Sequence, residues 1–144
     1  MKLKLLYALP LLTLLAGCMG SNNKNAAPVP FPSGNFKGQF RAIHQNSKTG
    51  YHDTLKAILN LSLSTTTGFK VTGDTATVHA GSFGDYAMNS ALVQFVDNTL
   101  PKTGKPAKIH LSGYYQYYYD GTVFQMLAAP SDTLVYQYDL KKVN

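Results

Sequence analysis

Hydrophobic and polar residues alternate with a period of two along most of the chain after Gly34. The alternation is clearest in residues 55–63, where one face carries Leu55, Ala57, Leu59, Leu61 and Leu63. Successive side chains of a β-strand point to opposite faces, whereas a helix would distribute these residues around its circumference. The pattern therefore predicts a strand with one buried face.

Similar alternation predicts seven further strands. They cover residues 36–42, 69–72, 75–80, 86–96 and 109–119, a segment that starts at Thr122, and residues 134–140. Polar or glycine-rich segments separate them, and the longest connection is 97–107. These connections are too short for crossovers between parallel strands, which need a dozen or more residues. We therefore expect an all-β fold, an antiparallel up-and-down meander of about eight strands.

The dipeptide Asp120-Gly121 lies between two of these alternating segments and predicts a tight β-hairpin. Two-residue hairpin loops need residues that tolerate positive φ, which glycine and aspartate do. A loop of these two residues pairs Tyr119 with Thr122 and Tyr117 with Phe124. In that register the apolar faces of the two strands agree.

Residues 34–144 suit one domain, because most domains contain roughly 100–150 residues. Eight antiparallel strands can close into a barrel whose interior holds side chains or one small ligand. A two-sheet β-sandwich is the alternative that the same strands allow.

The first eighteen residues have the features of a secretion signal. Lys2 and Lys4 give a positive start, and residues 5–15 form an apolar run that is too short to cross a bilayer as a helix. The run ends in Leu15-Ala16-Gly17-Cys18, which resembles the lipobox of bacterial lipoproteins. The resemblance implies that residues 1–17 are a signal peptide and that Cys18 carries the lipid that anchors the chain to a membrane.

The residues after Cys18 suggest a location and a tether. Lipoproteins retained in the inner membrane tend to have Asp after the lipidated cysteine, but Met19 stands here, which favours the outer membrane. Residues 21–25 contain no acidic residue of the kind that exports some lipoproteins to the cell surface, which favours the periplasmic face. Residues 18–33 are rich in Pro and Asn and read as a disordered tether.

The start of the folded part resembles a known β-barrel family. Residues 35–40 read Asn-Phe-Lys-Gly-Gln-Phe, which is similar to the first strand of lipocalin-like (calycin) barrels. In that family a glycine beside an aromatic residue lets the strand bend as the barrel closes. Lipocalins usually place Trp just after this glycine, and this chain contains no Trp. The resemblance implies a calycin-like barrel.

Composition argues against metal, cofactor and catalytic chemistry. The chain has one cysteine and no glutamate, so neither a disulfide framework nor a Cys-rich zinc site is expected. His44, His52, His79 and His110 are far apart in sequence, and we interpret them as separate strand or surface residues. Residues 81–84 include a serine between glycines but lack the Gly-x-Ser-x-Gly spacing of a nucleophile elbow. We expect no enzyme activity, no metal and no cofactor.

Residues 114–119 contain five tyrosines and one glutamine. Alternation places Tyr115 and Tyr117 with the apolar residues, in the core or lining a cavity, and Tyr114 and Tyr118 on the outer surface. Cross-strand packing of aromatic pairs is one reason for such a segment. A surface that binds a sugar, an apolar ligand or a protein partner is the other, because tyrosine is enriched at interfaces. These four tyrosines are the candidate binding residues.

Beyond Cys18 the chain carries 11 basic and 7 acidic residues. Lysines gather around the longest connection, where they read as solvated loop charges rather than as a nucleic-acid site, which an envelope location also disfavours. The sequence as a whole suggests an envelope lipoprotein. It would be a non-catalytic, membrane-tethered binding module for a small apolar or sugar-like ligand or a protein partner. A structural lipoprotein with a filled core and no ligand is the alternative.

Overall fold

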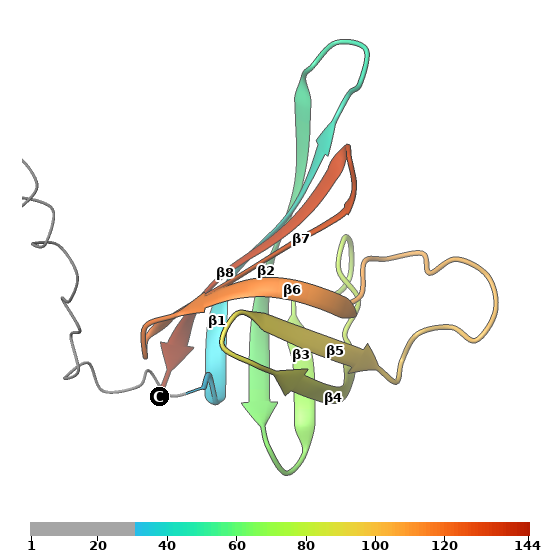
Figure 1. The fold of residues 1–144 in the computed structure, drawn as a ribbon. Coiled ribbons are helices and arrows are strands. Elements are labelled where there is room, and N and C mark those ends of the chain that lie inside the picture. The colour runs from blue at the N-terminus through green and yellow to red at the C-terminus, as the bar shows by residue number, and fades with distance from the viewer. Residues whose placement is uncertain (1–30) are drawn as a thin grey trace, which may run out of the picture.

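The computed structural model describes residues 31–144, which form a closed barrel of eight antiparallel strands (Figure 1). The strands are β1 (Gly34–Gln45), β2 (His52–Ser64), β3 (Gly68–Gly73), β4 (Phe83–Met88), β5 (Leu92–Asp97), β6 (Gly113–Tyr119), β7 (Val123–Ser131) and β8 (Leu134–Val143). Each strand pairs with the next, and β8 pairs with β1. The eight strands therefore form one closed sheet rather than the two packed sheets of a sandwich. The predicted meander barrel is confirmed. The lipobox, Cys18 and residues 18–30 of the tether lie outside the described residues.

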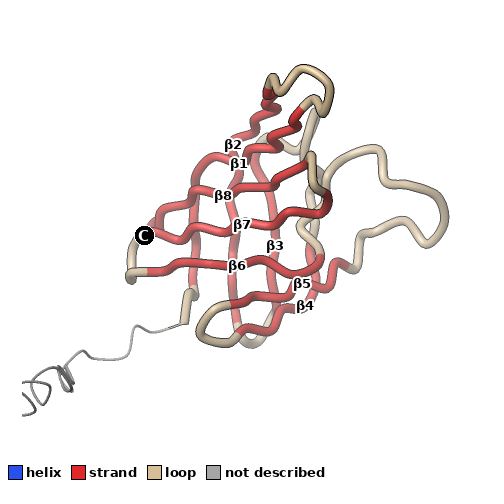
Figure 2. Tube along the Cα trace, turned by 45° about the horizontal axis from the view of Figure 1, so that its top comes forward, coloured by secondary structure: helices blue, strands red, loops and turns tan. Residues whose placement is uncertain are grey.

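The up-and-down order puts alternate connections at opposite ends of the barrel. The β1–β2, β3–β4, β5–β6 and β7–β8 connections share one end, which we call the mouth end (Figure 2). The other three turns share the opposite end with the start of β1 and the end of β8. Because the tether joins β1 at Gly34, we call this second end the tether end. The mouth end therefore points away from the segment that leads to Cys18.

The barrel closes along the seam between β1 and β8, which pair over ten residues on each strand. Gly38 lies in this seam opposite Leu140. A Cβ atom at position 38 would lie 2.0 Å from the carbonyl oxygen of Asp139, so only glycine allows the two backbones to approach this closely. The glycine between Phe36 and Phe40 thus has a role in closure, as the resemblance to calycin barrels implies.

Side chains fill the barrel interior. Phe36 and Phe124 have ring centroids 5.3 Å apart, and Phe40 and Tyr138 are 4.8 Å apart. These rings are almost completely inaccessible to water. Aromatic side chains from β1, β7 and β8 therefore occupy the centre of the barrel. Tyr115, predicted to lie in the core or to line a cavity, is packed in this core.

Two of the predicted strands are wrong. Residues 75–80 belong to the β3–β4 connection, and their only bridge joins His79 to Ile109. Residues 86–96 form β4 and β5 with a turn between them, rather than one strand. Asn89 makes this turn, because its Oδ1 accepts hydrogen bonds from the backbone N–H groups of Ala91 and Leu92 at 2.9 and 2.8 Å. The two errors offset each other, so the count of eight strands is correct.

The β6–β7 hairpin lies where it was predicted, but its register differs. Tyr119 pairs with Phe124 rather than with Thr122, so the turn is centred one residue later. Asp120 explains the shift, because its Oδ1 accepts hydrogen bonds from the N–H groups of Thr122 and Val123 at 2.8 and 2.7 Å. Gly121 has a φ of +101°. The shift moves each partner by two residues, so the apolar faces still agree.

We expect Gly121→Val to destabilise the barrel by about 1 kcal/mol or more, because a β-branched residue resists the positive φ at this position. The measurement is the midpoint of urea unfolding at constant m-value. Thr122→Val is the matched control, since a β-branched residue already occupies that exposed position. Equal midpoints for wild type and Gly121→Val would show that φ at residue 121 does not limit the turn.

Leu55 was predicted to be buried with the rest of its strand face, and this is wrong. Ala57, Leu59, Leu61 and Leu63 are buried, but Leu55 is 51% exposed. It points to the inner side of β2 at a level beyond the packed interior, where β1, β2, β7 and β8 extend at the mouth end (Figure 1). Its exposure is therefore a property of the mouth end, which is described below.

Candidate functional site

The four candidate tyrosines of β6 divide between the two faces of the strand. Tyr114 and Tyr118 point outward and are 65% and 57% exposed, whereas Tyr115 is 1% exposed. Tyr117 is half-buried against the core, and its hydroxyl donates a hydrogen bond to the carbonyl of Asn89 at 2.5 Å. Burial raises the pKa of Tyr115 to about 12. The predicted positions of Tyr114, Tyr115 and Tyr118 agree with the structure, and Tyr117 lies at the margin of the core.

The two outward tyrosines have uncharged partners on β5 and β7, and the nearby Asp139 on β8 accepts a hydrogen bond from Gln125 at 2.9 Å. The register places Gln94 beside Tyr114 and Gln125 beside Tyr118, with Gln116 between Leu92 and Leu127. We call this surface the tyrosine strip; it comprises Leu92, Gln94, Tyr114, Gln116, Tyr118, Gln125 and Leu127. A shallow groove of about 240 Å³ lies along it, lined in part by Tyr114, Gln94 and Asn89. Aromatic faces and side-chain amides are therefore the chemistry that this wall offers.

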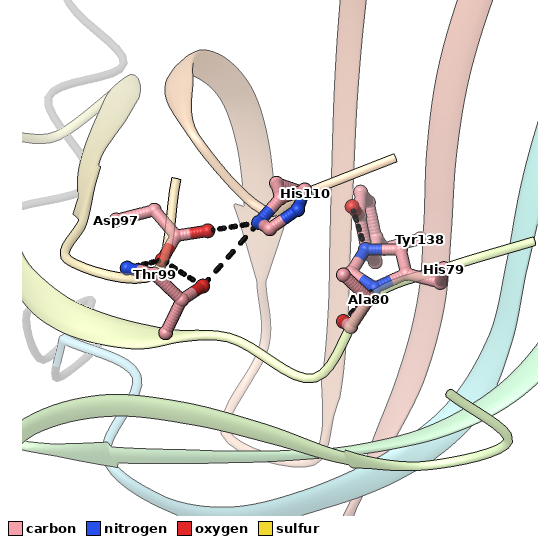
Figure 3. Close-up of polar contacts among 6 residues, drawn as sticks. All are labelled: His79, Ala80, Asp97, Thr99, His110 and Tyr138. Carbon is pink, nitrogen blue, oxygen red and sulfur yellow. Dashed lines mark hydrogen bonds and ion pairs between the residues drawn. The ribbon is translucent and has the colours of Figure 1, made fainter. Parts of the chain in front are cut away.

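A second candidate site lies at the mouth end, where Asp97 holds His110 (Figure 3). Asp97 ends β5, and its side chain is fully buried. One carboxylate oxygen accepts a hydrogen bond from Nδ1 of His110 at 2.8 Å. The other accepts from the N–H and the hydroxyl of Thr99 at 2.7 and 2.6 Å. With three donors, the buried carboxylate is satisfied, as a buried charged group must be.

His79 lies beside this pair and is buried at the mouth end of the core. Its Nδ1 donates to the carbonyl of Ala80 at 2.6 Å, and its Nε2 accepts from the hydroxyl of Tyr138 at 2.8 Å (Figure 3). Its ring packs edge-on against Phe40, with centroids 4.8 Å apart. Burial lowers the pKa of His79 to about 4, and the hydrogen bond to Ala80 opposes this only in part. The imidazole is therefore neutral at pH 7.

The four histidines have separate hydrogen-bond partners or exposed positions, although two of them lie near each other. His44 and His52 are exposed near the β1–β2 turn, but His79 and His110 lie in neighbouring segments joined by the His79–Ile109 bridge. Within residues 31–144 no three His, Cys, Asp or Glu side chains come together as a metal site would require. Asp97 and His110 are thirteen residues apart across the longest connection, so no local motif indicates their pairing.

Ser82, the serine of the glycine-flanked segment, is buried. Its Oγ has no hydrogen-bond partner in the part of the chain that the structure describes. A serine nucleophile is activated by a hydrogen-bonded base. No described residue acts as that base for Ser82.

A groove at the mouth end lies beside His110. It measures about 610 Å³ and is bounded by Leu55 on β2, Tyr136 on β8 and the two connections 74–82 and 98–112. A smaller groove of about 420 Å³ lies at the tether end, between residues 31–33 and the ends of β2 and β4. We call the larger one the mouth groove.

The fold and these features define a class: a small, closed, antiparallel β-barrel with a filled interior and candidate binding features on its wall and at its mouth end. Comparison of the chain with protein-family models, with curated proteins and with solved structures finds no match. Residues 31–144 contain no helix that could cross a membrane.

Proposed function

We propose that this chain is a lipid-anchored lipoprotein of the bacterial envelope, tethered through Cys18 to the outer membrane on its periplasmic side. Its barrel is a non-catalytic binding module that holds a sugar-like ligand on the tyrosine strip. The lipobox-like residues 15–18 support the anchor, and the Pro-rich tether supports a domain held away from the lipid. The strip lies on the side wall of the barrel and runs from Tyr114 near the mouth end to Leu92 and Tyr118 near the tether end.

The observation that carries the proposal is the exposure of Tyr114 and Tyr118, whose partners on the neighbouring strands are the uncharged residues Gln94 and Gln125. Sugars present apolar C–H faces, which stack on aromatic rings, and hydroxyl groups, which hydrogen-bond to amides. Gln94 and Gln116 supply amides beside the two rings, whereas Nε2 of Gln125 already donates to Asp139 at 2.9 Å. An anionic or cationic ligand would find no opposite charge within the strip. A neutral, hydroxyl-rich ligand therefore fits best.

A structural lipoprotein without a ligand is the second candidate, and the filled interior favours it. Calycin-like barrels that carry ligands need interior space, whereas here the rings of Phe36, Phe40 and Phe124 occupy the centre. Any ligand of this barrel therefore binds at its surface.

Removing either outward tyrosine should abolish carbohydrate binding and leave the fold intact. The full chain in detergent is mixed with peptidoglycan sacculi and sedimented; we expect wild type to co-sediment and both Tyr118→Ala and Tyr114→Ala to remain in solution. Surface substitutions of this kind usually change stability by no more than about 0.5 kcal/mol, so the melting temperatures should agree. Tyr51→Ala is the matched control, because Tyr51 is 79% exposed and lies outside the strip.

Failure of wild type to co-sediment would rule out this ligand. Photo-crosslinking from a benzophenone residue at position 116 in the host then separates the remaining candidates. A crosslinked protein would favour a protein partner on the strip. Absence of any crosslink would favour the structural lipoprotein.

A further inference from the structure

The mouth groove has the size and walls of a small-molecule site. Its volume of about 610 Å³ falls within the range of roughly 300–1,000 Å³ that ligand pockets span. Leu55, Val78, Leu100, Ile109 and Tyr136 provide apolar walls. Leu55 is half-exposed although it lies on the inner side of β2, opposite Ala42 on β1. The groove therefore leaves an apolar surface open above the filled core.

His110 contributes a hydrogen-bonding group to this apolar groove. The carboxylate of Asp97 is only an acceptor, so the Nδ1 that faces it carries a proton, and the tautomer of a neutral imidazole held in this way has its lone pair on Nε2. Nε2 has no hydrogen-bond partner among residues 31–144 and is not buried, while the side chain as a whole is only 12% exposed. A rigid acceptor thus faces the accessible space of the groove.

The surroundings of His110 carry balanced charge. Lys108 lines the groove, and its Nζ donates to the carbonyl of Thr75 at 2.8 Å. The buried Asp97 supplies one negative charge behind the imidazole. With one charge of each sign and apolar walls, the groove has no net charge with which to attract an ion.

We propose that the mouth groove is a second binding site, independent of the tyrosine strip, for a small uncharged molecule with an apolar body and a hydroxyl group. The apolar body lies against Leu55, Ile109 and Tyr136, and the hydroxyl donates to Nε2 of His110. Asp97 is a positioning residue, because it holds the imidazole in the tautomer that accepts. The groove opens at the end of the barrel opposite the tether, so a membrane-anchored chain presents it away from the lipid.

Two matched probes test the hydrogen bond. 2-Naphthol carries the hydroxyl, and 2-methoxynaphthalene has the same ring system without a donor. The full chain is placed in lipid nanodiscs, with protein-free nanodiscs as the reference for probe dissolved in lipid. We expect saturable binding of 2-naphthol, with 2-methoxynaphthalene about tenfold weaker, which is the effect of one net hydrogen bond at the upper end of its usual range.

The isoleucines report where the probe binds. The chain contains only Ile43, Ile58 and Ile109, so selective methyl labelling gives three signals. Ile109 lines the groove, whereas Ile43 and Ile58 lie on the opposite, outward side of β1 and β2. We expect 2-naphthol to shift the Ile109 methyl signal and to leave the other two unchanged.

Two substitutions separate the groove from the fold. Leu55→Trp fills the groove and should abolish binding of both probes, and Ile58→Trp, on the outward side of the same strand, should leave both affinities unchanged. His110→Phe should bring the two probes to equal affinity. If His110→Phe fails to fold because Asp97 loses its partner, Leu55→Trp still decides the location, since it does not touch that pair.

Equal affinity of wild type for the two probes would overturn the proposal, as would shifts at Ile43 or Ile58 or binding that survives Leu55→Trp. Tyr118→Ala should retain 2-naphthol binding in full. Loss of binding in that variant would place the probe on the tyrosine strip and would likewise overturn the proposal. Failure at the mouth groove leaves the test with sacculi unaffected, so the two sites are distinguished.

Discussion

Gly38→Ala is expected to prevent closure of the barrel and to destabilise it by about 3 kcal/mol or more. Extra volume in a well-packed site usually costs about 1–3 kcal/mol, because neighbouring side chains can shift. Here the added Cβ would lie 2.0 Å from the carbonyl oxygen of Asp139 and 2.8 Å from the Cα of Leu140. These are backbone atoms of β8, so the two strands must separate for the methyl group to fit.

Urea unfolding monitored by far-UV circular dichroism measures this effect. Gly81→Ala is the matched control, because a Cβ at position 81 would meet its nearest neighbour at an ordinary 3.6 Å. We expect the control to unfold within about 0.5 kcal/mol of wild type. A Gly38→Ala variant as stable as the control would show that the β1–β8 seam tolerates wider spacing than the structure has.

The prediction at Gly38 combines a sequence signal with a fact that the sequence does not contain. The glycine between two phenylalanines resembles the first strand of calycin barrels, and this resemblance suggested a bend. The partner at the seam is Leu140, which is about a hundred residues away in the chain. Alternation shows which face of each strand is buried but not which backbone approaches it, so the close contact emerges only from the fold.

The strand assignment succeeded where alternation was regular, as in residues 55–63, and for residues 86–96 it failed because a side chain forms a turn. In residues 55–63 the apolar side chains fall on odd-numbered positions throughout, and these residues lie in β2. In residues 86–96 the inward positions change from even to odd numbers: Tyr86 and Met88 face inward before the turn, and Val93 and Phe95 face inward after it. A continuous strand cannot make that change without a bulge. The change in parity was the signal in the sequence that a turn lay at Asn89.

The mouth groove could not be predicted in the same way. Leu55 and Leu59 occupy the same face of β2 in the sequence pattern, but Leu55 is exposed and Leu59 is buried. The difference depends on how far the packed interior extends along the barrel axis. The pairing of Asp97 with His110 depends on how the long β5–β6 connection folds back. Polar residues in such connections have no period, so their contacts are tertiary and are not encoded locally. The outward tyrosines, in contrast, lie on a regular strand and were predictable.

Protonation of His79 should make the barrel sensitive to acid. The folded pKa of about 4 lies below the value of 6.5 for an unperturbed histidine, and burial is the main cause. A histidine with a lowered folded pKa contributes its full stability above pH 6.5 and loses it as the pH falls towards 4. A shift of this size corresponds to about 3 kcal/mol in total, of which about 2.5 kcal/mol should be lost between pH 7.5 and 4.5.

The groups that face His79 define the controls. Tyr138 and Phe40 contact its ring, and His110 and Asp97 act on it through their charges in opposite directions. At pH 4.5 most carboxylates are still ionised, so acid titration of aspartates contributes little in this window. The difference between the unfolding free energies measured in urea at pH 7.5 and pH 4.5 therefore arises mainly from histidines. His44→Gln and His52→Gln, at exposed positions, should leave the difference unchanged.

The decisive variant is His79→Leu combined with Tyr138→Phe. Replacing both residues removes the hydrogen bond between them without leaving one of its two partners unsatisfied, while the carbonyl of Ala80 and the hydroxyl of Tyr115 each lose a partner at both pH values. The double variant should be stable at pH 7.5 and should lose about 2.5 kcal/mol less than wild type on acidification to pH 4.5. If it instead loses as much stability as wild type, His79 is not the acid-sensitive group.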